Sequence, residues 1–566
     1  MGSSLRLLLV VTAIAPAAPG RADTLVMADV TRPDLVPSYL IIAPRRAIPA
    51  VLPLAAWRAA HGHAARVAPV EAVYAAHRAL PRHEAIRAFL DDLRRRSRGP
   101  TLRYVLLVGT ADPHNSDGLH LPTWSRPASY CAPDLPGDEA LIGDHPFAVA
   151  RGAHLPDLAV GRFPARRLEE VETLVRKTLD YERLPRRGAW RRQVDLYAGQ
   201  GGYGAAIDAA LERLFSFMVT HHIPNDLRVY FAYANPVSPY GYSPPQFADN
   251  LTRRLSAGPA LMVYTGHGGA DGFDSFWWQG RRNRIMDASA VSAVSGLAGR
   301  TTVVSIACTT GRFDGLRPAI GERLVTSPGG PVAFIGASRV SQPYANGVLA
   351  GYLSEALVTQ RVATIGDALA QAKRGLAGDQ PAGFRLLLDL MAAAHLGGPA
   401  RAAQRGDQLM LYNLLGDPAL RNGIVPAEVT VEAQRSARPG EAVVVALRAP
   451  VASGLAHVSL TIPRDRMLPG ALATATRTPT ERQMNETNTR ANDKVVSEAR
   501  VRVVAGRAQW TVTMPRGIAG PLHLNAYVEG HERDAAGTRE IRLIGSPHQS
   551  AVTVARPCAR PDACRS

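Results

Sequence analysis

Short apolar segments that alternate with helix-length amphipathic segments constrain the fold of this chain most strongly. The segment Tyr104–Gly109 is apolar at every position up to its final glycine, so both of its faces must be covered. A strand buried on both faces is typical of a parallel sheet flanked by helices. Further strands of this kind are expected at Tyr39–Ala43, Leu158–Gly161, Val194–Ala198, Leu227–Phe231, Pro259–Tyr264, Thr301–Ile306 and Pro331–Gly336. The alternation therefore predicts an α/β fold with a largely parallel sheet.

The rhythm of strands and helices is interrupted twice along the 566 residues. Charged residues around Arg186 and the glycine at 188 predict a boundary between an α/β subdomain at 23–187 and a second one at 188–423. After residue 423 short alternating strands follow one another with turn residues between them, which predicts a β-sandwich at 424–556. Within it, the polar stretch Leu468–Asp493 is expected to be a mobile loop.

The two ends of the chain carry signals of their own. Residues 1–22 combine one arginine, a short apolar run and small residues, which is the pattern of a secretory signal peptide and predicts a secreted or periplasmic protein. No later apolar run is long enough to span a membrane stably. In the tail at 557–566, Cys558 and Cys564 are close enough in sequence to form a small disulfide, whereas Cys131 and Cys308 lie in unlike contexts.

The basic charge does not point to a nucleic-acid partner. The formal net charge is +17, but only three of the 65 basic residues are lysines. A bias this strong is typical of a general preference for arginine rather than of one basic surface. The arginines at 94–96 lie at the end of an expected helix, where cations are favourable for the helix dipole.

A histidine and a cysteine each follow the end of an expected buried strand. His267 lies in the segment Tyr264–Gly269, and Cys308 lies in Ala307–Gly311. Ligands of open parallel sheets bind where the strands end, so the two side chains can face each other if their strands are neighbours. An imidazole beside a thiol generates a thiolate nucleophile. The pair therefore predicts nucleophilic catalysis, although a single buried cysteine or loop histidine would more often be structural.

These two segments resemble the catalytic segments of the gingipain family, which are caspase-like cysteine peptidases. Three further stretches are similar to that family and occur in the same order: Tyr104–Gly109, Pro156–Arg162 and Leu414–Leu420. The resemblance extends from Tyr39 to Arg421 and implies a caspase-like catalytic domain in two subdomains. It also implies that the region after residue 423 is immunoglobulin-like.

The resemblance implies a role for each of the motif residues. Cys308 would be the nucleophile, His267 the general acid/base, and the main-chain N–H groups of Gly268 and Cys308 the oxyanion hole. The implied activity is that of a cysteine endopeptidase acting on a protein or peptide substrate through an acyl-enzyme thioester. No cofactor is required for this chemistry.

The sequence also departs from the family pattern. An acidic residue helps to orient the histidine in gingipains, and the aligned position here is Gln200, whose neutral amide stabilises an imidazolium less. The acidic residue that selects arginine has no clear counterpart, with Asp208 only nearby. Two alternatives therefore stay open: a weak or inactive caspase-like protein-binding module, and a transpeptidase that uses the same dyad.

Two groups of residues have the chemistry of metal ligands. Asp134, Asp138, Glu139 and Asp144 are hard oxygen ligands in a Pro/Gly-rich stretch, which fits either a structural calcium site or a polar loop. His61 and His63 have no cysteine or carboxylate at ligand spacing, which favours a solvated helix end over a metal site.

Overall fold

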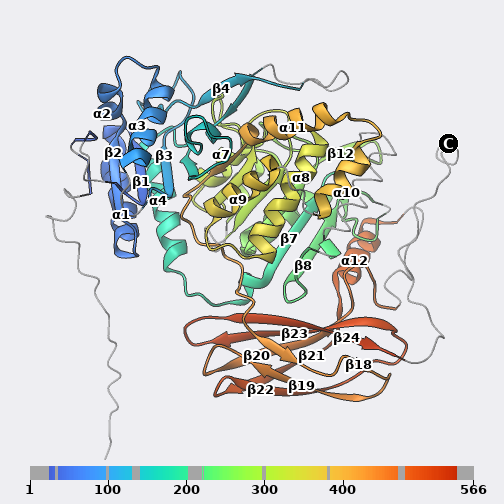
Figure 1. Ribbon diagram of the computed structural model, residues 1–566. Helices are drawn as coiled ribbons and strands as arrows, with labels where there is room; N and C mark the ends of the chain where they lie inside the picture. Colours follow the sequence, from blue (N-terminus) through green and yellow to red (C-terminus); the bar gives the residue numbers. More distant parts are fainter. Residues whose placement is uncertain are drawn as a thin grey trace, which may run out of the picture.

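The computed structural model describes residues 25–27, 29–31, 36–96, 101–130, 140–201, 219–220, 222–236, 238–295, 301–378, 383–469 and 479–544. A large α/β region carries a separate β-rich region below it (Figure 1). None of the helices in these ranges is long and apolar enough to cross a membrane.

A ten-stranded sheet forms the centre of the α/β region, in the order β2-β1-β3-β6-β16-β15-β14-β9-β7-β8. Its first half contains β1 (Tyr39–Ala43), β2 (Ala65–Pro69), β3 (Tyr104–Val108), β6 (Ala159–Phe163) and β16 (Tyr412–Leu415). Its second half contains β7 (Gln193–Ala198), β8 (Arg228–Tyr233), β9 (Leu261–Thr265), β14 (Thr302–Ile306) and β15 (Ala333–Ala337). The α/β fold class is confirmed, and every strand expected before residue 423 is present within a few residues of its expected bounds.

The two halves of the sheet run in opposite directions. Neighbouring strands are parallel within each half, but β15 pairs with β16 in antiparallel register. The change of direction at β16 was not expected, because the short segment before Gly416 lacks the length of the other apolar strands. As a consequence, the strands of the second half all end at one edge, which is not the edge where those of the first half end.

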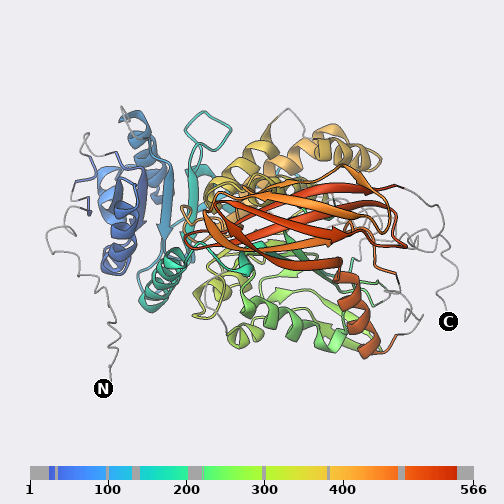
Figure 2. The same ribbon diagram turned by 90° about the horizontal axis from the view of Figure 1, so that it is seen from below.

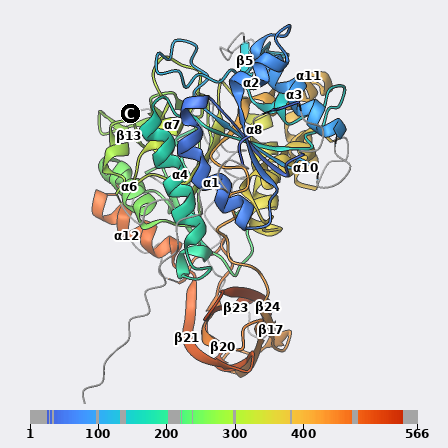
Figure 3. The ribbon, with the colours of Figure 1, turned by 90° about the vertical axis from the view of Figure 1, so that its left-hand side faces the viewer.

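Helices cover both faces of the sheet (Figure 3). On one face lie α1 (Ile48–Ala60), α4 (Leu168–Arg183), α6 (Phe247–Ala257) and α7 (Ile320–Thr326). On the other face lie α2 (Val70–Ala76), α3 (Arg82–Arg96), α8 (Pro343–Ser354), α9 (Ile365–Ala377), α10 (Gly383–Ala392) and α11 (Gly398–Leu411). Consecutive residues of a strand belong to opposite cores, as Val303 and Val304 of β14 show.

The C-terminal region consists mainly of β-strands, as expected, together with one helix that is described below. Its eight strands form a single hydrogen-bonded sheet that curls until β17 approaches β24, and one apolar core fills the interior (Figure 3). The strands are β17 (Thr430–Glu432), β18 (Ser436–Ala437), β19 (Ala442–Arg448), β20 (Ser453–Thr461), β21 (Val495–Val504), β22 (Arg507–Thr513), β23 (Gly520–Gly530) and β24 (Ala535–Leu543). Figure 2 shows this sheet from below, lying across the α/β region.

The stretch expected to be a mobile loop contains a helix instead. α12 (Glu481–Asn492) begins at Thr480, whose side chain accepts from the Gln483 N–H while the Gln483 side chain accepts from the Thr480 N–H. This reciprocal capping stabilises the first turn of a helix that has little apolar surface. The polar side chains that suggested a loop belong instead to a helix that binds the main chain of another strand.

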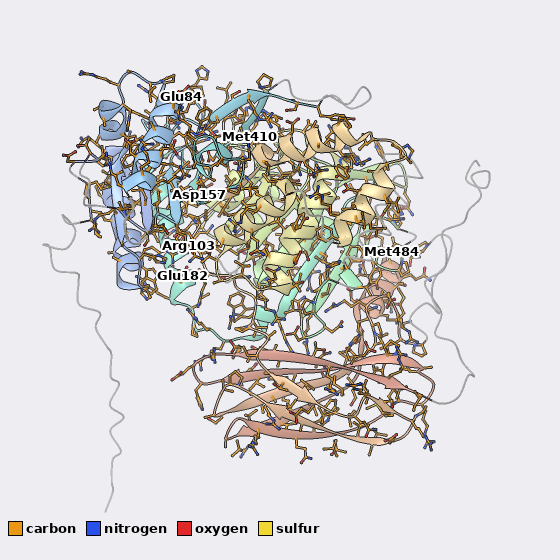
Figure 4. All side chains as sticks on the ribbon, in the orientation of Figure 1. Glu84, Arg103, Asp157, Glu182, Met410 and Met484 are labelled. Carbon is orange, nitrogen blue, oxygen red and sulfur yellow. The ribbon has the colours of Figure 1, made fainter. Side chains whose placement is uncertain are left out.

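α12 lies against β8, the edge strand of the large sheet; Met484 marks the helix in Figure 4. The Asn492 Oδ1 accepts the Phe231 N–H at 2.7 Å, and the Nδ2 groups of Asn488 and Asn492 donate to the Phe231 carbonyl at 3.0 and 2.9 Å. At Phe231, asparagine side-chain amides thus form the hydrogen bonds that a neighbouring strand would otherwise form. Such pairing protects an exposed strand edge from association with other chains.

A buried arginine joins the first half of the sheet to its connecting loops. Arg162 of β6 has no exposed surface and forms a bidentate ion pair with Asp144 at 2.7 and 2.8 Å. Its guanidinium also donates to the carbonyls of Gly109, Leu121 and Pro122. Asp144, one of the four potential calcium ligands, is therefore engaged by arginine.

We predict that Arg162→Met lowers the free energy of unfolding by about 3–5 kcal/mol, because it leaves a buried carboxylate without its cation. The control is Arg95→Met, which removes the partner of Asp92 in an ion pair whose arginine is 70% exposed and should cost less than about 1 kcal/mol. Urea unfolding of the two variants provides the measurement. Equal losses of stability in both variants would contradict the prediction.

Candidate active site

The predicted histidine and cysteine lie at the same edge of the sheet. β9 and β14 are adjacent and parallel, with Thr265 opposite Ile306. His267 and Cys308 each follow two residues beyond this matched pair. The shared register brings the two turns together.

The two turns approach each other closely at Gly268. A Cβ atom built on this residue would lie 2.6 Å from the Thr310 Cγ2, 2.9 Å from the Ala307 Cβ and 3.1 Å from the Cys308 carbonyl oxygen. Any side chain at 268 would push the histidine turn away from the cysteine turn. The requirement for glycine next to His267 is therefore steric.

The imidazole of His267 is half-buried and has a main-chain partner. Its Nε2 lies 3.2 Å from the carbonyl oxygen of Gly201, which follows β7. A carbonyl oxygen can only accept, so the Nε2 carries the proton in the neutral ring and the Nδ1 keeps its lone pair. The ring is thereby prepared to accept a proton at Nδ1.

The structure gives this Nε2 a different partner from the one predicted. The Gln200 side chain is exposed, and the carbonyl of the next residue receives the imidazole hydrogen bond. Sequence alignment selected the correct segment, because β7 pairs with β9 in register at Ala198 and Thr265. It could not identify a main-chain atom, which every residue type offers equally.

Tyr264 fixes the position of the histidine turn. The Tyr264 hydroxyl donates to the His267 carbonyl at 2.7 Å and accepts the Asp274 N–H at 3.2 Å, and its ring stacks on Phe273 with 4.0 Å between centroids. Glycines surround the hydroxyl: a Cβ on Gly199 or Gly266 would come within 2.8 or 2.9 Å of it. Gly266 also has φ +151°, a backbone conformation that side chains rarely allow.

The Cys308 side chain is partly exposed and its thiol is free. The next residue, Thr309, has φ +60°, an uncommon conformation for threonine that concentrates at functional sites. Within the described part of the chain, the Cys308 N–H has no hydrogen-bond acceptor. An unoccupied donor beside a thiol has the form that an oxyanion hole requires.

The sulfur contacts one residue from a third strand end. The Ser341 N–H lies 3.4 Å from the Cys308 Sγ, the Ser341 carbonyl oxygen 3.6 Å and its Oγ 3.8 Å. Ser341 follows β15, which is the other neighbour of β14. The sequence did not single out this serine, although its position after the apolar segment Pro331–Gly336 was an available signal.

The model of peptidase family C25 matches residues 32–423, which is most of the chain. The chain belongs to peptidase family C25. Its match covers both halves of the sheet together with the His267 and Cys308 turns. Membership makes the protein a cysteine-type peptidase of gingipain-like fold.

Three solved structures are similar to this chain. The crystal structure of the Arg-specific cysteine proteinase gingipain R is 16% identical with a TM-score of 0.49, covering 90% of this chain and 98% of that one. A complex of the pro- and mature domains of RgpB from Porphyromonas gingivalis is 17% identical with a TM-score of 0.48, covering 89% and 100%. A structure described as a protease is 14% identical with a TM-score of 0.50, covering 89% and 97%. A search of curated proteins found no match.

Several predicted residues of this C25 chain fall outside the described residues. These are the signal segment 1–22, the cysteines at 131, 558 and 564, Asp208, and three of the potential calcium ligands, Asp134, Asp138 and Glu139. The described ranges contain no group of three or more His, Cys, Asp or Glu residues that could hold a metal. His61 caps the end of α1 and stacks on Trp57 at 3.8 Å between centroids, which is a structural role.

We predict that Tyr264→Phe lowers kcat of this C25 peptidase roughly 10- to 100-fold, because the His267 turn loses the hydrogen bond that positions it. The matched control is Tyr197→Phe on β7, which removes a hydroxyl bonded to Asn250 at 2.7 Å and should leave kcat nearly unchanged. Steady-state kinetics with one peptide substrate, together with thermal unfolding of both variants, tests this. A similar loss of kcat in the two variants would show that Tyr264 acts only through stability.

Proposed function

We propose that the chain is an exported cysteine endopeptidase in which Cys308 is the nucleophile and His267 the general acid/base. The observation that carries the proposal is the placement of both residues two positions beyond paired residues of adjacent parallel strands. The contact of His267 with Gly201 supports it, because an Nε2 that donates to a carbonyl oxygen places the ring lone pair on Nδ1, the nitrogen that can accept a proton.

The reaction begins with proton transfer from the Cys308 Sγ to the His267 Nδ1. The thiolate attacks the carbonyl carbon of the scissile peptide, and the negative charge that develops on the carbonyl oxygen is stabilised by the N–H groups of Cys308 and Gly268. As the C–N bond breaks, the imidazolium gives its proton to the leaving amine. The products of this stage are a free amine and a thioester between Cys308 and the acyl part of the substrate.

Water completes the cycle. His267 accepts a proton from a water molecule while the water oxygen attacks the thioester carbon, and the C–S bond then breaks. The acid product leaves, and the sulfur and the imidazole return to their starting states. A transpeptidase would follow the same path with an amine in place of water.

Three features support the endopeptidase over a protein-binding module. The thiol is partly exposed and free, the adjacent N–H lacks an acceptor within the described residues, and the histidine ring is held by Gly201. A module that only binds proteins requires none of these. Export is supported by the signal-like segment at 1–22 and is part of the proposal.

We predict that Cys308→Ala lowers kcat/KM by roughly 10³-fold or more while the protein stays folded, because the nucleophile is lost and little packing is removed. The control is Cys131→Ala, which should keep full activity. Peptide hydrolysis, and labelling with an active-site-directed electrophile followed by mapping of the modified residue, provide the measurements. Full turnover by Cys308→Ala, or a label on another residue, would overturn the assignment.

A further inference from the structure

The contacts between Cys308 and Ser341 are more specific than packing. Ser341 is buried and presents two donors to the sulfur, its main-chain N–H at 3.4 Å and its hydroxyl at 3.8 Å. Its carbonyl oxygen, at 3.6 Å, can accept from the thiol S–H but cannot stabilise a thiolate. The two states of the sulfur therefore use different atoms of the same residue.

A chain of hydrogen bonds fixes the direction of the Ser341 hydroxyl. The Asn346 Oδ1 accepts from the Gln408 Nε2 at 2.7 Å and from the Tyr412 hydroxyl at 2.8 Å. The Asn346 Nδ2 then faces Ser341 and donates to its Oγ at 2.9 Å. With that acceptor position occupied, the hydroxyl proton is available to the Cys308 sulfur.

The supporting residues are rigidly placed. Gln408 of α11 and Tyr412 of β16 are almost completely buried, and Asn346 lies in the first turns of α8. Ser341 also precedes Gln342, the N-cap of α8, so its N–H is near the positive end of a twelve-residue helix. A helix N-terminus favours a negative charge on a nearby group such as a thiolate.

We propose that Ser341 is a positioning residue that stabilises the Cys308 thiolate through its N–H and its hydroxyl, and that Asn346 orients the hydroxyl for this task. This inference rests on the proposed function, since it assigns a reactive state to Cys308. It adds two hydrogen-bond donors of Ser341, at the end of β15, to the general base His267 at the end of β9. The proton that leaves the sulfur goes to the His267 Nδ1, and the Ser341 hydroxyl keeps its own.

Other charged groups near the sulfur do not replace these donors. On the segment after β9 the titratable groups are His267, Asp271 and Asp274, and the cysteine's own loop carries Arg312 and Asp314. On the segment after β15 the titratable group is Arg339. Its guanidinium lies 2.9 Å from the carboxylate of Asp314, a residue of the cysteine's own loop. The described residues after β7, Gly199–Gly201, carry no charge.

The test follows the pH dependence of iodoacetamide alkylation at Cys308 in the full-length protein, with the modified residue mapped by mass spectrometry. In Ser341→Ala the thiolate loses one donor, so the midpoint of alkylation should move to higher pH by about one unit, and alkylation below the midpoint should slow about tenfold. Ser341→Thr retains the hydroxyl and should restore a midpoint near that of the wild type. The acid limb of kcat/KM should shift in the same direction as the alkylation midpoint.

The matched control is Ser338→Ala. Ser338 is a buried serine on the same segment whose hydroxyl donates to the carbonyls of Ile142 and Leu411, so its loss should leave the alkylation midpoint unchanged. If Ser341→Ala fails to fold, Asn346→Asp provides the same test. A carboxylate at 346 can only accept, so it would draw the Ser341 hydroxyl away from the sulfur and raise the midpoint.

The outcomes separate this inference from the proposed function. A wild-type Cys308 that is alkylated, with the same midpoint in Ser341→Ala, overturns the role of Ser341 and leaves Cys308 as the nucleophile. A Cys308 that iodoacetamide does not reach, or whose loss leaves peptide hydrolysis intact, overturns the proposed function and this inference together. An upward shift in Ser338→Ala equal to that in Ser341→Ala would show a general loosening of the segment and would also overturn it.

Discussion

The parallel pairing of β7, β9, β14 and β15 is the constraint on which the candidate active site depends. Register aligns Ala198 with Thr265 and Thr265 with Ile306, so the residues that follow them meet at one edge. Each strand end supplies a different chemical function: a carbonyl acceptor at Gly201, an imidazole, a thiol and a pair of donors at Ser341. A slip of one residue in any of these pairs would turn a side chain to the opposite face and dismantle the set.

Much of this arrangement could be predicted because it depends on side-chain type and strand pattern. Apolar strands and flanking glycines located His267 and Cys308, and the order of the motifs indicated the fold. Gly201 was missed because its contribution is a carbonyl oxygen. Ser341 was missed because its proposed role depends, through Asn346, on Gln408 and Tyr412, which are distant in the sequence. Such networks arise from packing across the chain, which a one-dimensional pattern does not contain.

The same distinction explains why two elements of the fold, α12 and β16, were not predicted. The polar composition at 481–492 correctly indicated little apolar burial, but it could not reveal that asparagine amides would bind the main chain of β8. β16 has only four residues and was not recognised, although it joins the two halves of the sheet. Both elements owe their structure to partners that precede them by many residues.

The contact of α12 with the edge strand β8 also implies an order of events during biosynthesis. Ribosomes produce the chain from its N-terminus, so the edge strand and both reactive side chains exist well before Asn488 and Asn492 have been made. During that interval the nascent sheet offers the main-chain groups of Phe231 to any extended segment nearby. The contacts from α12 end this exposure, so the edge of the large sheet is closed at Phe231 only once residues up to Asn492 have been made.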